Sequence, residues 1–205
     1  MAEEISSKIR SSFEDSISLK QEIIDQGLLE TLIAIGDCIS ESISNEGTFL
    51  LCGNGGSAAE AQHLAAEFLI RLTSNVNRQG LPAHSLVQDS STFTACVNDF
   101  SSEDIFSRNL RTLGNTRDVL LAISTSGNSK NIVKVLMEAK QLNIKTIGFL
   151  GGNGGKALRH CDFSFVVPSD STARIQEAHI TAGHSVLQYV EDKLKQEGFL
   201  EILQE

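Results

Sequence analysis

Two polar loops carry the residue types that could bind an anion. The first, Ser124–Ser129, reads Ser-Thr-Ser-Gly-Asn-Ser and directly follows the apolar run Asp118–Ile123. A helix is expected to follow from about Lys130, so the loop's hydroxyls would meet free backbone N–H groups where the helix dipole favours negative charge. An ordinary capping turn would carry fewer hydroxyls. The loop therefore predicts a phosphate site that needs no lysine or arginine.

The second loop, Gly53–Ser57, is rich in glycine and precedes a segment of high helix propensity. Ser57 stands where a helix N-cap is expected. The glycine spacing does not fit the dinucleotide-binding pattern, and Gly151–Lys156 is one residue too short for a nucleotide triphosphate loop. We expect Gly53–Ser57 to contact the hydroxyl groups of a ligand, and Gly151–Gly155 to be a flexible turn.

Two side chains on the helix after Gly53–Ser57 could act together. His63 and Glu67 are four residues apart, so they share one helix face. They could be solvated surface residues, but their helix starts at a ligand-binding loop, which places its first turns beside the ligand. A carboxylate there could move a proton between two carbons of a sugar.

The last expected helix carries three further polar candidates. Gln176 and His184 are eight positions apart, an axial rise of about 12 Å. One metal ion or one substrate would hardly be held by both within a single chain. If both act, we expect subunits to share sites. His179 is interpreted as an ordinary, partly buried histidine.

Composition limits the class of protein. The net charge of −9 over 205 residues argues against a nucleic-acid-binding surface. No targeting segment is visible, and no apolar run is long enough to span a membrane. The cysteines are far apart, form no CxxC pair and lie mainly within apolar patterns, which favours buried thiols and a cytoplasmic location: Cys38, Cys52, Cys96 and Cys161.

The order of apolar patterns predicts an α/β fold in one domain, residues 1–205. Strands are expected at Thr48–Cys52, Ala83–Val87, Asp118–Ile123, Lys145–Leu150 and Phe163–Val167. Helices are expected at 57–70, from Asp89, around 105–110, at 130–142 and at 172–195. Strands that alternate with helices indicate a three-layer sandwich around a parallel sheet.

Two apolar helix faces have no assigned partner. Residues 3–45 form an N-terminal helical region with a break near Asp25–Gly27, and Ile5, Ile9, Phe13 and Ile17 recur at a spacing of four. This region could pack on the sheet or against a neighbouring subunit. In the helix from Asp89, the apolar face is expected to comprise Phe93, Ala95, Cys96 and Val97.

Several ordered motifs together resemble the sugar isomerase (SIS) domain family, and within it the phosphoheptose isomerases. They are Gly53-Asn54-Gly55-Gly56-Ser57, His63-x-x-x-Glu67, Asn98-Asp99, Ser124–Ser129 and Arg174-Ile175-Gln176-Glu177-x-His179. The resemblance spans about residues 10–195. It implies a five-stranded parallel sheet flanked by helices and a homotetramer. It also implies conversion of D-sedoheptulose 7-phosphate to D-glycero-D-manno-heptose 7-phosphate, the first step of bacterial heptose biosynthesis.

The same resemblance implies roles for individual residues. Glu67 and His184 match the acid/base pair, which acts through a cis-enediol. One zinc ion per subunit would be held by His63, Glu67, Gln176 and His184. The phosphate would lie on Ser124, Thr125, Ser126 and Ser129. Further substrate contacts would come from Asn54, Gly55, Gly56, Ser57, Glu67, Arg71, Asn98, Asp99, Thr172 and Gln176.

Two other functions share these loops. Some tetramers of the same fold are non-catalytic and bind a replication initiator protein, but they lack residues matching Glu67 and His184. This chain retains both residues, which favours the enzyme. An isomerase or sensor of another ketose phosphate would carry the same phosphate loop.

Overall fold

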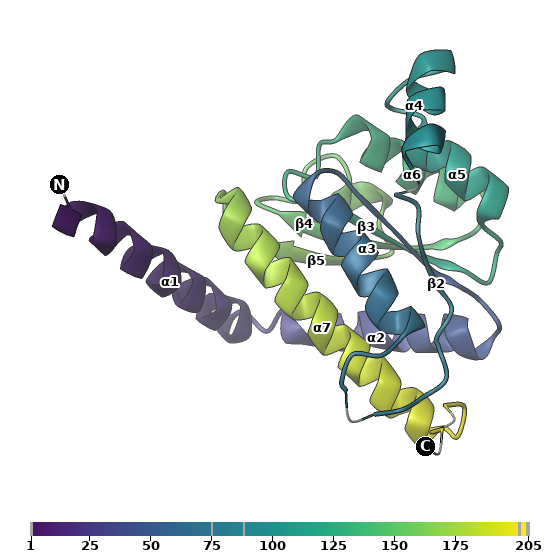
Figure 1. The fold of residues 1–205 in the computed structure, drawn as a ribbon, viewed down its shortest axis with the longest axis horizontal. Coiled ribbons are helices and arrows are strands. Elements are labelled where there is room, and N and C mark those ends of the chain that lie inside the picture. The colour runs from purple at the N-terminus through teal and green to yellow at the C-terminus, as the bar shows by residue number, and fades with distance from the viewer. Residues whose placement is uncertain (1, 75, 88, 201, 204–205) are drawn as a thin grey trace.

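The fold is built on one parallel sheet. The computed structural model describes residues 2–74, 76–87, 89–200 and 202–203. Its five strands lie in the order β2-β1-β3-β4-β5, and every neighbouring pair is parallel (Figure 1). The strands are β1 (Phe49–Gly53), β2 (Ala83–Ser85), β3 (Val119–Ser124), β4 (Lys145–Gly151) and β5 (Phe163–Val167). The predicted α/β class and five-stranded parallel sheet are confirmed.

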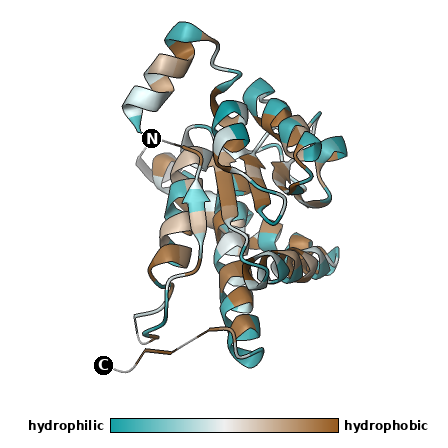
Figure 2. Ribbon diagram, turned by 90° about the vertical axis from the view of Figure 1, so that its right-hand side faces the viewer, coloured by the Kyte–Doolittle hydropathy of each residue, from teal (hydrophilic) through white to brown (hydrophobic). Residues whose placement is uncertain are grey.

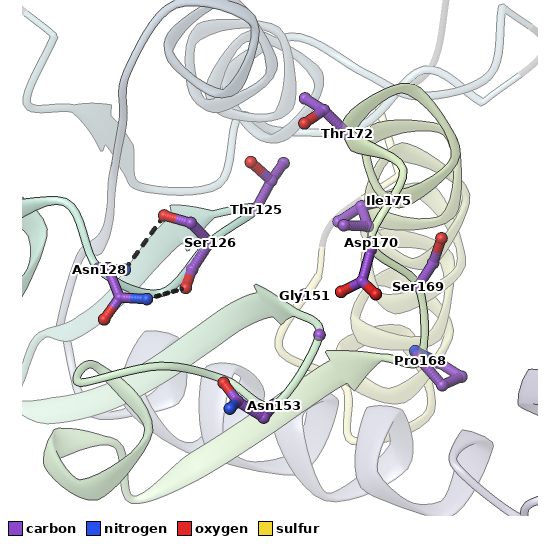
Figure 3. Close-up of a pocket in the computed structure, with 11 residues that line it drawn as sticks. Thr125, Ser126, Asn128, Gly151, Asn153, Pro168, Ser169, Asp170, Thr172 and Ile175 are labelled. Carbon is purple, nitrogen blue, oxygen red and sulfur yellow. Dashed lines mark hydrogen bonds between the residues drawn. The ribbon is translucent and has the colours of Figure 1, made fainter.

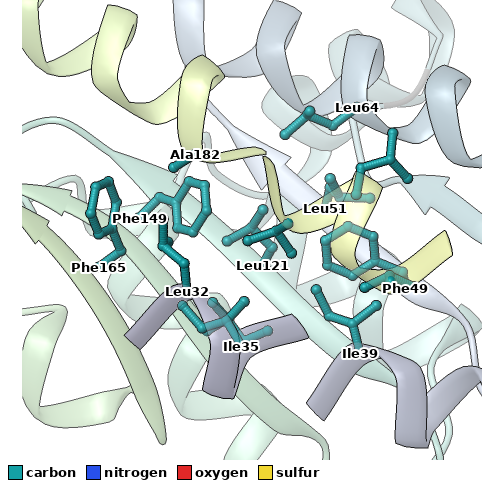
Figure 4. Close-up of a cluster of buried hydrophobic side chains, with 14 of the residues drawn as sticks. Leu32, Ile35, Ile39, Phe49, Leu51, Leu64, Leu121, Phe149, Phe165 and Ala182 are labelled. Carbon is teal, nitrogen blue, oxygen red and sulfur yellow. The ribbon is translucent and has the colours of Figure 1, made fainter. Parts of the chain in front are cut away.

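Helices cover both faces of this sheet. On one face lie α2 (Leu29–Ser44), α3 (Gly56–Leu69) and α7 (Thr172–Gln196), which share a core with Phe49, Leu51 and Leu121 (Figure 4). On the other lie α5 (Ile105–Leu113), α6 (Lys130–Gln141) and the short 3-10 helix Leu158–His160, around Leu50 and Leu120. Figure 2 shows the apolar residues gathered in the central strands. Burial on both faces explains why the strands read as unbroken apolar runs.

The first helix, α1 (Ala2–Asp25), extends away from the body of the molecule (Figure 1). Near its C-terminal end Leu19 and Ile23 are buried, but Ile5, Ile9, Phe13 and Ile17 are 63–70% exposed. Gly27, with φ +71°, provides the expected break before α2. Within one chain, therefore, α2 packs on the sheet, whereas the stripe on α1 does not.

The helix α4 (Ser90–Asp99) begins as expected, and its apolar face is left partly exposed. Asp89 caps it, because its Oδ1 accepts hydrogen bonds from the backbone N–H groups of Ser91 and Thr92. Its apolar face does not point into the core, since Phe93 and Val97 are 45% and 44% exposed. An apolar spacing identifies a face of a helix but not what covers it.

The four cysteines are free thiols. Cys52 is buried in β1, as predicted, whereas Cys38, Cys96 and Cys161 are half-buried. Burial raises the pKa of the Cys38 thiol to about 11 and that of the Cys161 thiol to about 12. No helix among the described residues is long and apolar enough to cross a membrane.

His179 is a structural residue, as predicted, and it is fully buried. Its ring lies against Phe149 and Phe165, and its Nε2–H donates to the Leu150 carbonyl at 3.0 Å. Burial lowers the pKa of His179 from 6.5 to about 4. As the pH falls, this histidine is therefore protonated in the unfolded chain before it is protonated in the folded one.

We predict that acid destabilises the fold through this histidine. Its contribution to stability is fully present above about pH 6.5 and is lost as the pH falls through about 4. The loss amounts to about 3 kcal/mol. In His179→Gln, which keeps a donor for Leu150 but does not titrate, urea unfolding followed at pH 7, 5 and 4 should lack this component. Identical pH dependence in the two proteins would contradict the prediction.

Candidate functional site

The hydroxyl loop lies between β3 and α6, at the carboxyl end of the sheet. Gly127 has φ +60° and donates its N–H to Ser124 Oγ at 3.2 Å. Ser126 Oγ accepts from the Asn128 N–H at 3.2 Å, and Ser124 Oγ is 3.4 Å from Ser129 Oγ. Ser129 is the residue that precedes α6. The hydroxyls are thus held beside a helix N-terminus, as an anion site requires.

A hollow of about 610 Å³ opens beside this loop (Figure 3). Of the predicted residues, Thr125, Ser126 and Thr172 line it. Residues that sequence reasoning missed also line it: Asn128, Gly151, Gly152, Asn153, Ser169 and Asp170. Each of these follows, or ends, one of the strands β3, β4 and β5. The position at the carboxyl ends of parallel strands is the signal that could have found them.

The turn Gly151–Gly155 is a wall of the hollow and not a free turn. The Ala157 N–H donates to the Gly127 carbonyl at 2.9 Å, and the Lys156 N–H donates to Asn128 Oδ1 at 3.2 Å. A Cβ at Gly127 would lie 2.0 Å from the Gly154 carbonyl oxygen. Only glycine allows this contact, so the glycine turn holds the hydroxyl loop in place.

The glycine loop leads into α3 without a side-chain cap. The helix begins at Gly56, and Gly55, with φ +55°, precedes it. Ser57 is therefore buried inside the first turn, and its prediction as N-cap is wrong. The positive φ of Gly55 turns the chain directly into the helix. Asn54 lies outside, where its amide exchanges hydrogen bonds of 2.9 and 2.8 Å with the amide of Asn131 on α6.

Helices α3 and α7 bring the predicted acid/base residues together. His63 Nε2 lies 2.8 Å from His184 Nε2, and Glu67 Oε1 lies 3.8 Å from His63 Nε2. A Cβ at Gly183 would lie 2.7 Å from Leu64 Cδ1, so glycine allows the two helices to approach closely here. One chain thus joins residues that are 121 positions apart.

A second hollow, of about 500 Å³, adjoins this group. Gly56, Glu60, His63, Gln176, Glu177 and Ile180 are among its lining residues. Gln176 Nε2 would be 2.4 Å from a Cβ at Gly56, so this side chain rests on the glycine loop. Because His63 contacts His184 and lines one hollow with Gln176, the spacing of Gln176 and His184 no longer requires a second subunit.

Glu60 is a buried carboxyl that sequence reasoning missed. It is 7% exposed, and its Oε1 has no hydrogen-bond partner in the described part of the chain. Burial raises its pKa to about 8. It lies one turn before His63 on α3, and that spacing was the available signal. Its place beside His63 adds a protonatable group to the site.

The predicted zinc ligands fit the metal chemically. Two imidazole nitrogens, a carboxylate oxygen and an amide oxygen form a donor set that suits zinc. His63, Glu67 and His184 converge, although the separation of 2.8 Å between the two nitrogens is that of a hydrogen bond. No group of three His, Cys, Asp or Glu side chains among the described residues forms a ready metal site.

Several predicted substrate contacts are not among the residues that line either hollow: Asn54, Gly55, Ser57, Glu67, Arg71, Asn98, Asp99, Ser124 and Ser129. Arg71 follows the end of α3 and is exposed. Asn98 and Asp99 end α4, where the Asn98 amide donates to Asp99 Oδ1 at 2.8 Å. Their roles stay predictions.

Comparison with known proteins agrees with the fold and the motifs. The SIS domain family matches residues 12–151. A phosphoheptose isomerase of Clostridium acetobutylicum is 43% identical over 187 residues, covering 91% of this chain and 94% of that protein. The solved phosphoheptose isomerase of Neisseria gonorrhoeae aligns with a TM-score of 0.85 and 36% identity, over 92% of this chain and 99% of that one. The one from Francisella tularensis aligns with a TM-score of 0.86 and 35% identity, over 91% and 97% of the two chains.

Proposed function

The chain belongs to the SIS domain family, and we propose that it acts as a phosphoheptose isomerase. It converts D-sedoheptulose 7-phosphate into D-glycero-D-manno-heptose 7-phosphate, the first step towards nucleotide-activated bacterial heptoses. The observation that carries the proposal is the meeting of Glu67, His63 and His184 beside the hollow that His63 lines with Gln176. Relatives named phosphoheptose isomerase support it over nearly the whole chain.

The hydroxyl loop anchors the phosphate, and the helices act on the other end of the sugar. Hydroxyl and backbone N–H groups around Ser126 donate hydrogen bonds to the phosphate dianion, so that no cationic side chain is needed. Glu67 removes a proton from C1 of the ketose and returns it to C2, through a cis-enediol. His184, hydrogen-bonded to His63, moves protons among the sugar oxygens.

We propose one zinc ion per subunit, held by His63, Glu67, Gln176 and His184. When bound, zinc would polarise the sugar oxygens. The support is the donor set described above, in which His63 Nε2 lies 2.8 Å from His184 Nε2 and 3.8 Å from Glu67 Oε1. Gln176 lines the hollow with His63.

We further propose a homotetramer with shared active sites, located in the cytoplasm. The exposed apolar stripe on α1 supports an assembly, because one chain leaves large side chains such as Ile9 and Phe13 in water. Asn98 and Asp99, which line neither hollow of their own chain, would then be available to a neighbour. Four free cysteines suit a reducing compartment.

The experiment that tests the function is a direct assay. The purified protein is incubated with sedoheptulose 7-phosphate, with and without added zinc, and the aldose is detected by NMR. Formation of the heptose 7-phosphate supports the proposal. Absence of turnover with this substrate under both conditions, in folded protein, would contradict it and favour binding of another ketose phosphate or of a replication initiator protein.

Ser126→Ala is predicted to weaken substrate binding more than catalysis. The variant loses a hydroxyl that faces the proposed phosphate, so we expect KM to rise about 10-fold, the effect of one hydrogen bond to a charged group. The value of kcat should change little. Initial rates over a range of substrate concentrations measure both constants. Ser44→Ala, at the end of α2, is the control, and an unchanged KM for Ser126→Ala would count against the phosphate site.

Phe13→Glu is predicted to dissociate the tetramer. A charge in the α1 stripe must be desolvated if this face packs against another copy. Sedimentation velocity should show a tetramer for the original chain and smaller species for the variant. Met137→Glu, at an exposed apolar residue of α6, is the matched control and should remain tetrameric. A monomer of the original chain with full activity would refute the shared site.

A further inference from the structure

Arg78 is a buried arginine outside both hollows, in the segment between α3 and β2. Its side chain is 0% exposed, and it pairs with Glu191 of α7, whose side chain is 10% exposed. Buried charges are expensive unless every group is paired. Because this guanidinium is remote from the substrate hollows, its burial must be explained by the groups that it binds.

Every nitrogen of the Arg78 guanidinium has a partner. Nη2 donates to the carbonyl of Glu67 at 2.9 Å, and Nη1 donates to the carbonyls of Phe68 and Gln79, each at 2.9 Å. Nε donates to Glu191 Oε1. The final carbonyls of a helix lack donors from the next turn. Arg78 donates hydrogen bonds to such carbonyls at the C-terminal end of α3, and one of these carbonyls belongs to Glu67, the residue proposed as the base.

Glu191 connects this contact to the other half of the acid/base pair. It follows His184 by seven positions, or nearly two turns of α7, so the two residues lie on similar sides of that helix. Arg78 thus joins the backbone of Glu67 to the helix that carries His184. The close contact of Gly183 with Leu64 sets the separation of the helices, and the Arg78 contacts set how they are placed along one another.

The C-terminal segment covers the Arg78 loop. The Leu203 N–H donates to the Asn77 carbonyl at 2.8 Å, and Ile202 forms an antiparallel bridge with Arg78. The Gln79 amide donates to the Phe199 carbonyl at 3.4 Å. This cover keeps the Arg78–Glu191 pair away from water, where an ion pair is stronger and its geometry better defined.

We propose that Arg78 is a positioning residue, which aligns Glu67 on α3 with His184 on α7 for proton transfer. The inference rests on the proposed function, since it acts through the proposed base. Arg78 itself touches no substrate. A small displacement of a catalytic group, caused by a change far from the chemistry, is enough to slow turnover strongly.

The test compares three altered proteins with the original chain. Arg78→Gln combined with Glu191→Gln removes the contact without leaving one buried charge unpaired. Arg78→Lys keeps a cation for Glu191, but one ammonium does not reproduce the planar set of donors to the carbonyls. Arg111→Gln with Glu138→Gln is the matched control, because it removes an arginine–glutamate pair that joins α5 to α6 away from the site.

We expect the double variant at Arg78 and Glu191 to lower kcat about 100-fold with little change in KM. Arg78→Lys should recover part of this loss. The control pair should lower the melting temperature but keep kcat. Equal kcat values for the two double variants would overturn the inference. If the Arg78 double variant does not fold, a folded Arg78→Lys protein with the original kcat overturns it instead.

Nitrogen NMR of histidine-labelled, metal-free protein separates this inference from the proposed function. In the Arg78 variants the signals of His63 and His184 should shift, because their 2.8 Å contact depends on the placement of α3 against α7. The signal of the core residue His179 should not. If the original chain does not turn over sedoheptulose 7-phosphate, the proposed function is wrong. The NMR shifts of His63 and His184 in the Arg78 variants would still support the positioning role. Unchanged signals of His63 and His184 would overturn that role whether or not the enzyme is active.

Discussion

Glu67→Gln should lower kcat for sedoheptulose 7-phosphate by at least ~100-fold, the low end of a general acid/base contribution. The amide has nearly the size of the carboxylate but does not accept the proton from C1. KM should change little, because the hydroxyl loop anchors the phosphate on a different element. The side chain lies 3.8 Å from His63 Nε2, within the group formed by α3 and α7. Steady-state kinetics on the purified variant measure both constants.

A matched replacement controls for the loss of one negative charge. Glu46→Gln removes a carboxylate that pairs with Arg117, and its side chain is 83% exposed. Its kcat should equal that of the original chain. A Glu67→Gln protein that retains near-native kcat would show that another group is the base, and Glu60, about two turns earlier in α3, would be the next residue to replace.

His184→Gln should also lower kcat by at least ~100-fold. This variant removes the imidazole that contacts His63 and that is proposed to carry protons among the sugar oxygens. Glutamine retains hydrogen-bonding groups but does not shuttle a proton. The fold should survive, since the core histidine of α7 is His179, one turn and a half earlier.

The control for His184→Gln is His160→Gln in the short 3-10 helix, on the opposite face of the sheet from α7. It should keep the original kcat. Near-native turnover by His184→Gln would exclude the proposed role of this residue, even if Glu67→Gln is inactive.

The fold was predictable because its sheet is buried on both faces. Apolar runs such as Val119–Ile123 and Phe163–Val167 can be interpreted only as buried strands. The observed strands agree with the predicted ranges to within a residue or two, apart from the shorter β2. The apolar faces of α1 and α4 were recognisable, but their partners were not. Periodicity reports that a face is apolar, and exposure of Phe13 and Phe93 could be learned only from the packing.

The site was predictable where its residues are contiguous. The hydroxyl loop and the His63–Glu67 pair each lie in one local segment, so spacing alone groups them. The contact between His63 and His184 depends on how α3 packs against α7, and the sequence suggested it only through a family resemblance. Arg78 lies in a polar loop where nothing local distinguishes a buried ion pair from a solvated arginine.

The central claim is that Glu67 transfers a proton through an enediol. The most direct test is to measure the deuterium that becomes bound to carbon. The enzyme converts sedoheptulose 7-phosphate in D2O, and NMR reads C2 of the product. Because the Glu67 side chain is 23% exposed, its proton should exchange with solvent before it returns to carbon. We predict deuterium at C2 in product made by the original chain, and no exchange at C1 of the substrate in Glu67→Gln. Product formed in D2O with only hydrogen at C2 would contradict the account.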